Sequence, residues 1–302
     1  MKKRFLTILL LICIISVLCP VTARADMGPK PSVHITFQGM EDRQYYATLL
    51  SNTASHGPWS ENREYEGWMG SEQVWEAFRS YQDTDGFFFL GYFQDCTKEQ
   101  VFSWNYYPPE HFKILLYFPD SNTFLISEKA YKRYAFDSYF TIDLSALKVP
   151  GAEKKADPAQ KIVFEDSQAP LEKTYPYKGE FLSLLARIIG TLLIELAVAW
   201  PFGYWKKRPL LIIFFTNLLT QTLLNVGLNL VNFYSGYLAF LFSYVWLEIL
   251  VFLIEGTVYW KFMNKPQKGA KKAGHPWIYA AIANALSFLV GFFIARWVPG
   301  IF

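Results

Sequence analysis

The stretch VWLEILVFLIEG, Val245 to Gly256, places two glutamates, Glu248 and Glu255, seven residues apart in an otherwise apolar run. Seven residues make about two turns of an α-helix, so both acids would lie on nearly the same helix face. A charged side chain at the centre of a bilayer costs roughly 2.5–3.5 kcal/mol on insertion scales. If this run crosses a membrane, the two acids must therefore face polar partners or water, or hold protons.

Apolar length predicts that the run does cross a membrane. A membrane-spanning helix needs about 20 predominantly apolar residues, and four stretches of the C-terminal part meet this requirement. They cover residues 181–201, 210–231, 237–259 and 277–298. The sequence therefore predicts a transmembrane domain over residues 181–302, built as an all-α bundle of four transmembrane helices.

The segments between these stretches differ in charge. Residues 202–209 and 260–276 are rich in Lys and Arg, whereas Asn232–Gly236 carries no charged residue. Basic loops stay on the cytoplasmic side of a membrane, so the first two loops are expected inside and the third outside. The C-terminus would then be extracytoplasmic.

The beginning of the chain agrees with this orientation. A basic start and an apolar run, Phe5–Leu18, precede the residues Ala23-Arg24-Ala25. This order is typical of a signal peptide over residues 1–25, cleaved before Asp26. An uncleaved anchor helix is the alternative, although the apolar run is short for a span. Residues 26–180 are expected to be exported, which predicts a multi-pass protein of the cytoplasmic membrane.

Residues 26–149 have the pattern of an extracytoplasmic β-rich domain. Short aromatic and β-branched segments alternate with turn signals, and the segment KILLYF-PDSN-TFLIS is the clearest hairpin. One helix is expected over Glu72–Tyr81, with Ser71 as its cap. This spacing of strands predicts a β-sandwich, with an Ig-like fold as one form of it. Residues 150–180, rich in Pro, Lys and Glu, are expected to form a stem, and a strand at Lys161–Phe164 is left open.

Charge and cysteine content exclude several classes of function. Residues 26–180 carry a net charge of −8, so no basic surface for nucleic acid is expected. Cys96 is the one cysteine after the signal, and we expect it to be buried rather than reactive. Asp83–Gly86, DTDG, lacks the later ligands of a calcium loop and is interpreted as a turn. No metal site and no cofactor are predicted.

The predicted spans carry further polar residues. A helix rises about 1.5 Å per residue, and this rise sets how deep each polar residue lies in the bundle. One group is expected in the inner half, where it forms a candidate site. This inner group comprises Glu195, Asn217, Gln221, Glu248, Glu255 and Asn284. A second group is expected at the outer level and comprises Arg187, Asn225 and Asn229.

Three interpretations of the inner group stay open. Its side chains could join helices by hydrogen bonds, typically for about 0.6–2 kcal/mol each. They could bind a cation or proton, or line a polar pocket for a small substrate. An intramembrane catalyst is the least favoured interpretation, because no histidine lies in a predicted span and no HExxH motif occurs. An enzyme is therefore not expected.

The segments IIGTLLIELAVAW, TNLLTQTLLN and WLEILVFLIEGTVYW resemble a pattern in bacterial multi-pass membrane proteins that have an exported N-terminal domain and no assigned activity. This resemblance implies a shared bundle and nothing about chemistry. The predicted architecture favours a membrane-tethered sensing or binding module whose outer domain engages an envelope ligand or protein. Ion- or proton-coupled transport through the bundle is the alternative. Because four spans are few, transport would require a homo-oligomer.

Overall fold

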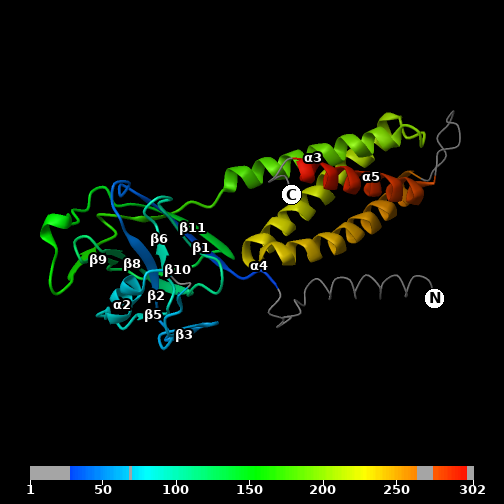
Figure 1. The fold of residues 1–302 in the computed structure, drawn as a ribbon. Coiled ribbons are helices and arrows are strands. Elements are labelled where there is room, and N and C mark those ends of the chain that lie inside the picture. Colours follow the sequence, from blue (N-terminus) through cyan, green and yellow to red (C-terminus); the bar gives the residue numbers. More distant parts are fainter. Residues whose placement is uncertain (1–27, 68–69, 264–274, 298–302) are drawn as a thin grey trace. The chain divides into compact units, whose positions relative to one another are not determined.

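The computed structural model describes residues 28–67, 70–263 and 275–297. Two compact units make up the chain: a β-rich unit, Pro29–Tyr175, and a helical unit that begins at Pro176 (Figure 1). The predicted signal peptide 1–25, most of the predicted loop 260–276 and the last residue of the fourth predicted span lie outside the described residues.

The described strands of the β-rich unit form two larger sheets and a small hairpin. One sheet has four strands in the order β13 (Leu171–Lys173), β11 (Asp137–Asp143), β1 (Ser32–Gln38) and β7 (Val101–Trp104). Strands β1 and β11 run parallel, and the other neighbours in this sheet are antiparallel. The hairpin joins β3 (Ser55–His56) to β4 (Trp59–Ser60).

The larger sheet contains seven of the described strands. Its path is β12 (Gln160–Phe164), β9 (Thr123–Ser127), β8 (His111–Phe118), β2 (Tyr46–Ser51) and β5 (Phe88–Phe89), with β10 (Tyr131–Lys132) on β8 and β6 (Gln94–Asp95) on β2. The predicted hairpin is confirmed, because β8 and β9 pair antiparallel with Leu115 opposite Ile126. Asn122, in the turn, has a φ of 50°, a conformation that Asn tolerates better than most residues.

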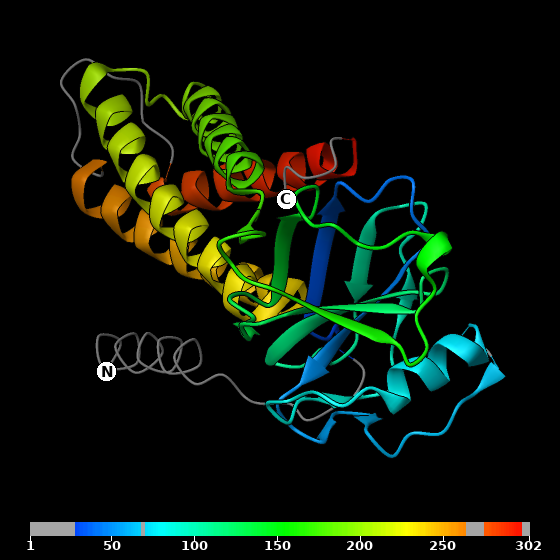
Figure 2. The same ribbon diagram turned by 90° about the vertical axis from the view of Figure 1, so that its left-hand side faces the viewer.

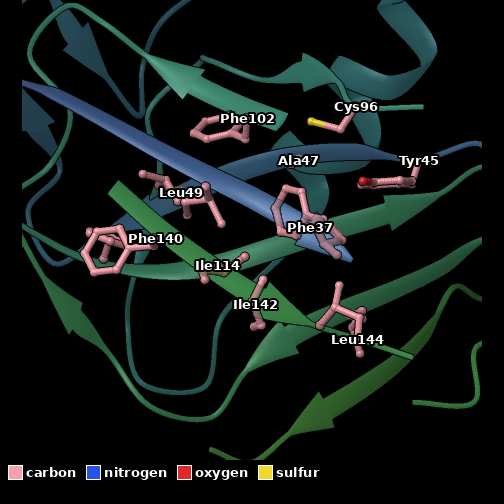
Figure 3. Close-up of a cluster of buried hydrophobic side chains, with 14 of the residues drawn as sticks. Phe37, Tyr45, Ala47, Leu49, Cys96, Phe102, Ile114, Phe140, Ile142 and Leu144 are labelled. Carbon is pink, nitrogen blue, oxygen red and sulfur yellow. The ribbon is translucent and has the colours of Figure 1, made fainter. Parts of the chain in front are cut away.

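The two sheets share one hydrophobic core (Figure 3). Strand β1 alternates, with Val33, Ile35 and Phe37 buried and the residues between them half-exposed. These side chains pack with residues of the second sheet such as Leu49 and Ile114. The expectation of a β-rich domain is thus confirmed. An Ig-like strand order is not shown, because the parallel pairs β1–β11 and β12–β9 join strands far apart in sequence.

Strand β8 is buried on both faces and therefore reads as a continuous apolar run. Ile114 belongs to the core between the sheets, whereas Leu115 lies on the opposite face under helix α2 (Glu72–Ser80). The predicted helix is confirmed, with Val74 and Phe78 buried against the sheet. Ser71 occupies the N-cap position, but its side chain makes no capping hydrogen bond.

The predicted stem needs correction, since part of residues 150–180 belongs to the sheets. Strand β12 pairs parallel with β9, which answers the open question about Lys161–Phe164, and β13 pairs with β11. Most side chains of these two edge strands are exposed, and Phe164 is their one buried residue. Their composition therefore resembles that of a linker even though their backbones are paired.

Cys96 lies in the core between the sheets and has no exposed surface. Its Sγ–H contacts the carbonyl oxygens of Gln94 and Val101 at 3.6 and 3.5 Å. Burial, with the nearby charge of Asp95, raises the pKa of this thiol well above its usual range. The expectation of a buried cysteine is confirmed.

The helical unit contains α3 (Tyr177–Ala199), α4 (Lys207–Met263) and α5 (Pro276–Trp297). Helix α4 is broken at Gly236, whose φ of 82° is far easier for glycine than for other residues. Figures 1 and 2 show its two arms, residues 207–235 and 237–263, folded back at this point. Helices α3 and α4 are long and apolar enough to cross a membrane, while the described apolar part of α5, Pro276–Val290, is shorter.

Candidate functional site

A cluster of buried polar side chains lies inside the helical unit. Helix α3 contributes Glu195, the first arm of α4 contributes Asn217 and Thr220, the second arm contributes Glu255 and Tyr259, and α5 contributes Asn284. Spacings of three and four residues place Asn217 with Thr220, and Glu255 with Tyr259, on single helix faces. These six residues, at most 7% exposed, are called the carboxyl cluster.

Asn217 connects three parts of the bundle. Its Nδ2 donates hydrogen bonds to Glu195 Oε2 at 2.6 Å and to the Tyr259 hydroxyl at 2.7 Å. The same nitrogen lies 3.1 Å from the carbonyl oxygen of Ile213, one turn earlier. One amide thereby joins α3 to both arms of α4.

Glu255 makes the corresponding connection to α5. Its Oε1 accepts a hydrogen bond from Thr220 Oγ1 at 2.6 Å, and its Oε2 accepts one from Asn284 Nδ2 at 2.7 Å. Both oxygens of this fully buried carboxyl group are therefore paired. Asn217 and Glu255 together link α3, both arms of α4 and α5.

The cluster has too few donors for its acceptors. Glu195 Oε1, Asn217 Oδ1 and Asn284 Oδ1 are buried and have no hydrogen-bond partner among the residues that the structure describes. An unpaired buried polar group typically costs about 1–3 kcal/mol. All three atoms accept hydrogen bonds, so an added proton or another positively charged donor would reduce the deficit.

Glu248 lies outside this hydrogen-bond network. Tyr244 lies one turn earlier on the same arm of α4. Glu248 also lines a cavity of about 100 Å³, called the bundle cavity.

The bundle cavity brings together a second set of polar residues of the unit. Its polar lining comes from α3, both arms of α4 and α5, and comprises Arg187, Thr191, Gln221, Asn225, Tyr244, Glu248 and Ser287. Arg187 donates hydrogen bonds through Nη2 to Asn229 Oδ1 at 3.3 Å and through Nε to the Ser183 carbonyl at 3.4 Å.

The nine polar residues singled out in the sequence thus fall into two neighbouring sites. Four of them belong to the carboxyl cluster: Glu195, Asn217, Glu255 and Asn284. Four others line the bundle cavity: Arg187, Gln221, Asn225 and Glu248. The ninth, Asn229, accepts a hydrogen bond from Arg187. Thr220, Tyr244, Tyr259 and Ser287 were missed. Helical spacing would have indicated them, because each lies three or four residues from a polar residue that was found.

Within the described ranges, no group of three or more His, Cys, Asp or Glu side chains could hold a metal ion. The chain matches no protein-family model, no curated protein and no solved structure. The geometry of the helical unit is therefore the main ground for a functional proposal.

Proposed function

We propose that the protein is a multi-pass membrane protein of the bacterial envelope whose helical unit holds a proton-binding site at Glu195 and Glu255. Helix α3, the two arms of α4 and α5 would be the four spans. Residues 26–175 would lie outside the cell, and the basic loops 202–209 and 260–276 inside. The site could serve proton-coupled transport or signal relay.

The surface of the helical unit supports its insertion in lipid. Leu193, Leu223 and Phe242 are 65–66% exposed, whereas Glu195, Asn217 and Glu255 have no exposed surface. Apolar side chains outside and polar side chains inside suit a protein whose solvent is lipid. The loop charges support the orientation through the positive-inside rule.

The observation that carries the proton site is the donor deficit around two buried carboxyl groups. Two ionised carboxylates would repel each other and would lose their hydration in this interior. A protonated carboxyl group is a donor as well as an acceptor, so a proton on Glu195 Oε1 would turn this unpaired acceptor into a donor for one further acceptor. Purely structural hydrogen bonding is the competing role, and it requires no proton exchange with water.

Carbodiimide labelling of native membranes tests this proposal, because the apolar reagent prefers protonated carboxyls in apolar surroundings. We expect mass spectrometry to find Glu195 or Glu255 modified, with modification falling as the pH rises. Glu255→Gln should remove the adduct at position 255 while the protein still folds. The exposed Glu172 of β13 serves as the control and should stay unmodified.

If the carbodiimide modifies Glu195 and Glu255 only after denaturation, at every pH tested, then the cluster does not exchange protons with water. The structural role would then replace the proposal. Proton-coupled transport adds a stricter requirement, since Glu255→Gln should also abolish proton flux in reconstituted vesicles. Unchanged flux in that variant would exclude Glu255 from a transport path.

The β-rich unit provides a second candidate function, the binding of an envelope ligand. On the four-stranded sheet, His34 bonds Ser32 Oγ and Ser103 Oγ through its two ring nitrogens, each at 3.0 Å. Ser32 Oγ donates to Asp137 Oδ1 at 2.6 Å, and the His34 ring stacks on Tyr139 with centroids 4.9 Å apart. Burial lowers the pKa of His34, so its ring is neutral at pH 7. Ser32, His34, Ser103, Asp137 and Tyr139 form this polar and aromatic row, which could recognise a polar ligand.

A fragment of residues 26–179 tests this second function, since the β-rich unit has its own core. We expect the folded fragment to be retained by one isolated envelope component, such as peptidoglycan or anionic lipid vesicles. Tyr139→Ala should reduce retention at least tenfold, and Tyr65→Ala, a partly buried tyrosine outside the row, should not. A folded fragment that binds none of these components would contradict a binding role.

A further inference from the structure

The bundle cavity is a partly open space between the helices, with Arg187 and Glu248 half-buried in its wall. Its volume of about 100 Å³ corresponds to roughly three water molecules at about 30 Å³ each. Gly190 lies on its wall, and a Cβ added there would meet no described atom within 4 Å. Binding sites are typically concave and combine apolar walls with a few convergent polar groups, and this cavity, lined by α3, both arms of α4 and α5, has that composition.

The charges that line this cavity are of both signs. Arg187 on α3 supplies a guanidinium group, and Glu248 on the second arm of α4 supplies a carboxyl group. Tyr244 lines the same cavity and adds a hydroxyl group. The cavity therefore presents a positive group and a negative group to the same space.

This pair of charges selects among ligand classes. A singly charged cation would be repelled by Arg187, and a singly charged anion would be repelled by Glu248. A molecule with one charge of each sign is complementary to both. Gln221 and Asn225 add amide groups, and the apolar wall can hold an apolar body. That wall includes Ile194, Leu224 and Phe288.

We propose that the bundle cavity binds a small zwitterion, with its anionic group toward Arg187 and its ammonium group toward Glu248. Two sources share this chemistry: a free amino acid with an apolar side chain, and the phosphoethanolamine head group of a lipid. The proposal rests on the cavity and does not require the proton site at Glu195 and Glu255.

Three compounds of similar shape and different charge test the ligand class. The full-length protein in lipid-free detergent is titrated with leucine, leucinamide and 4-methylpentanoate, and thermal stabilisation is followed. Glycerophosphoethanolamine, a phosphodiester with one charge of each sign, is titrated in parallel. We expect leucine or glycerophosphoethanolamine to bind at least tenfold more tightly than either singly charged compound. Equal binding of the three related compounds would overturn the proposal.

Lipid composition separates the two sources. Nanodiscs of phosphatidylethanolamine are compared with nanodiscs of phosphatidylglycerol, using the same thermal measurement. Stabilisation by phosphatidylethanolamine without a response to leucine identifies the lipid head group, and a response to leucine identifies the free compound. If neither leucine, glycerophosphoethanolamine nor phosphatidylethanolamine stabilises the protein, the cavity is not a zwitterion site.

Variants tie binding to the cavity. Gly190→Leu fills it and should reduce zwitterion affinity at least tenfold, whereas Gly227→Leu, on the first arm of α4 and equally unobstructed, should not. Glu248→Gln should lower the affinity for leucine and raise the affinity for 4-methylpentanoate relative to it. This variant also keeps the test decisive if Gly190→Leu fails to fold. If the protein binds a zwitterion but Glu195 and Glu255 are not labelled by carbodiimide, only the proton site is rejected. If these residues are labelled but no zwitterion binds, only the zwitterion site is rejected.

Discussion

Replacing Lys113 by methionine should destabilise the β-rich unit by about 3–5 kcal/mol, the usual cost of removing one partner of a buried ion pair. Lys113 Nζ lies 3.2 Å from Asp83 Oδ2, and the exposed fractions of the two side chains are only 4% and 1%. Asp83 Oδ2 also accepts hydrogen bonds from the amides of Asp85 and Phe87. Without Lys113, the Asp83 carboxylate would stay buried with its charge uncompensated.

Pulse proteolysis of the full-length protein in urea measures this loss, with the cleaved sites assigned to residues 29–175 by mass spectrometry. Lys129→Met is the matched control, because Lys129 pairs with Asp166 at 2.8 Å in an exposed position. Exposed pairs contribute about 0–1 kcal/mol, so the control should change little. A Lys113→Met variant as stable as this control would contradict the prediction.

The effect of Lys113→Met should also depend on pH. A hydrogen bond from Lys113, together with its charge, lowers the pKa of Asp85. A carboxyl group with a depressed pKa stabilises the fold above its unfolded pKa of about 3.9, and this stabilisation is lost as pH falls through the folded pKa. The contribution of Asp85 to the difference between wild type and variant should therefore shrink in acid.

Replacing Gly256 by leucine should destabilise the helical unit by about 1–3 kcal/mol, the usual cost of overpacking. A Cβ added at Gly256 would clash with atoms of the Trp277 ring, which must then move. Glu255 precedes this glycine and is bonded to Asn284 of α5 at 2.7 Å. Displacing α5 should therefore weaken this bond and alter carbodiimide labelling of Glu255.

Thermal unfolding in detergent checks this prediction, with Gly227→Leu as a control for the loss of a helical glycine. The double variant Gly256→Leu/Trp277→Ala removes the clashing ring and should recover part of the lost stability. A non-additive double-mutant cycle would locate the effect at this contact. Equal melting temperatures for Gly256→Leu and the control would show that α5 tolerates the side chain.

Glu248 and Glu255 show what local sequence can and cannot predict about a buried polar residue. A spacing of seven residues correctly puts Glu248 and Glu255 on one helix, but the structure gives them different surroundings. Glu255 is bonded to Thr220 and Asn284, whereas Glu248 lines the bundle cavity. The partners of Glu255 lie on the first arm of α4 and on α5, so helical periodicity within one stretch could not separate the two positions.

The segment DTDG gives a second example. The sequence favoured a turn over a calcium loop because later ligands were missing. The structure adds that Lys113, 30 residues from Asp83, places its ammonium group against both aspartates of this turn. A long-range contact of this kind leaves no local pattern, since it depends on the pairing of β8 rather than on the residues around Asp83.

The sequence by itself determined the division into β-rich and helical units, the β8–β9 hairpin, helix α2 and the polar positions of the helices. These features follow from apolar length, side-chain alternation and turn residues, which act within about 20 residues of chain. Only the tertiary structure decided the parallel pairing of β1 with β11, the place of β12 in the sheet and the partners of each polar side chain. Those outcomes depend on contacts between residues distant in sequence, where shape and hydrogen-bond satisfaction select one arrangement from many.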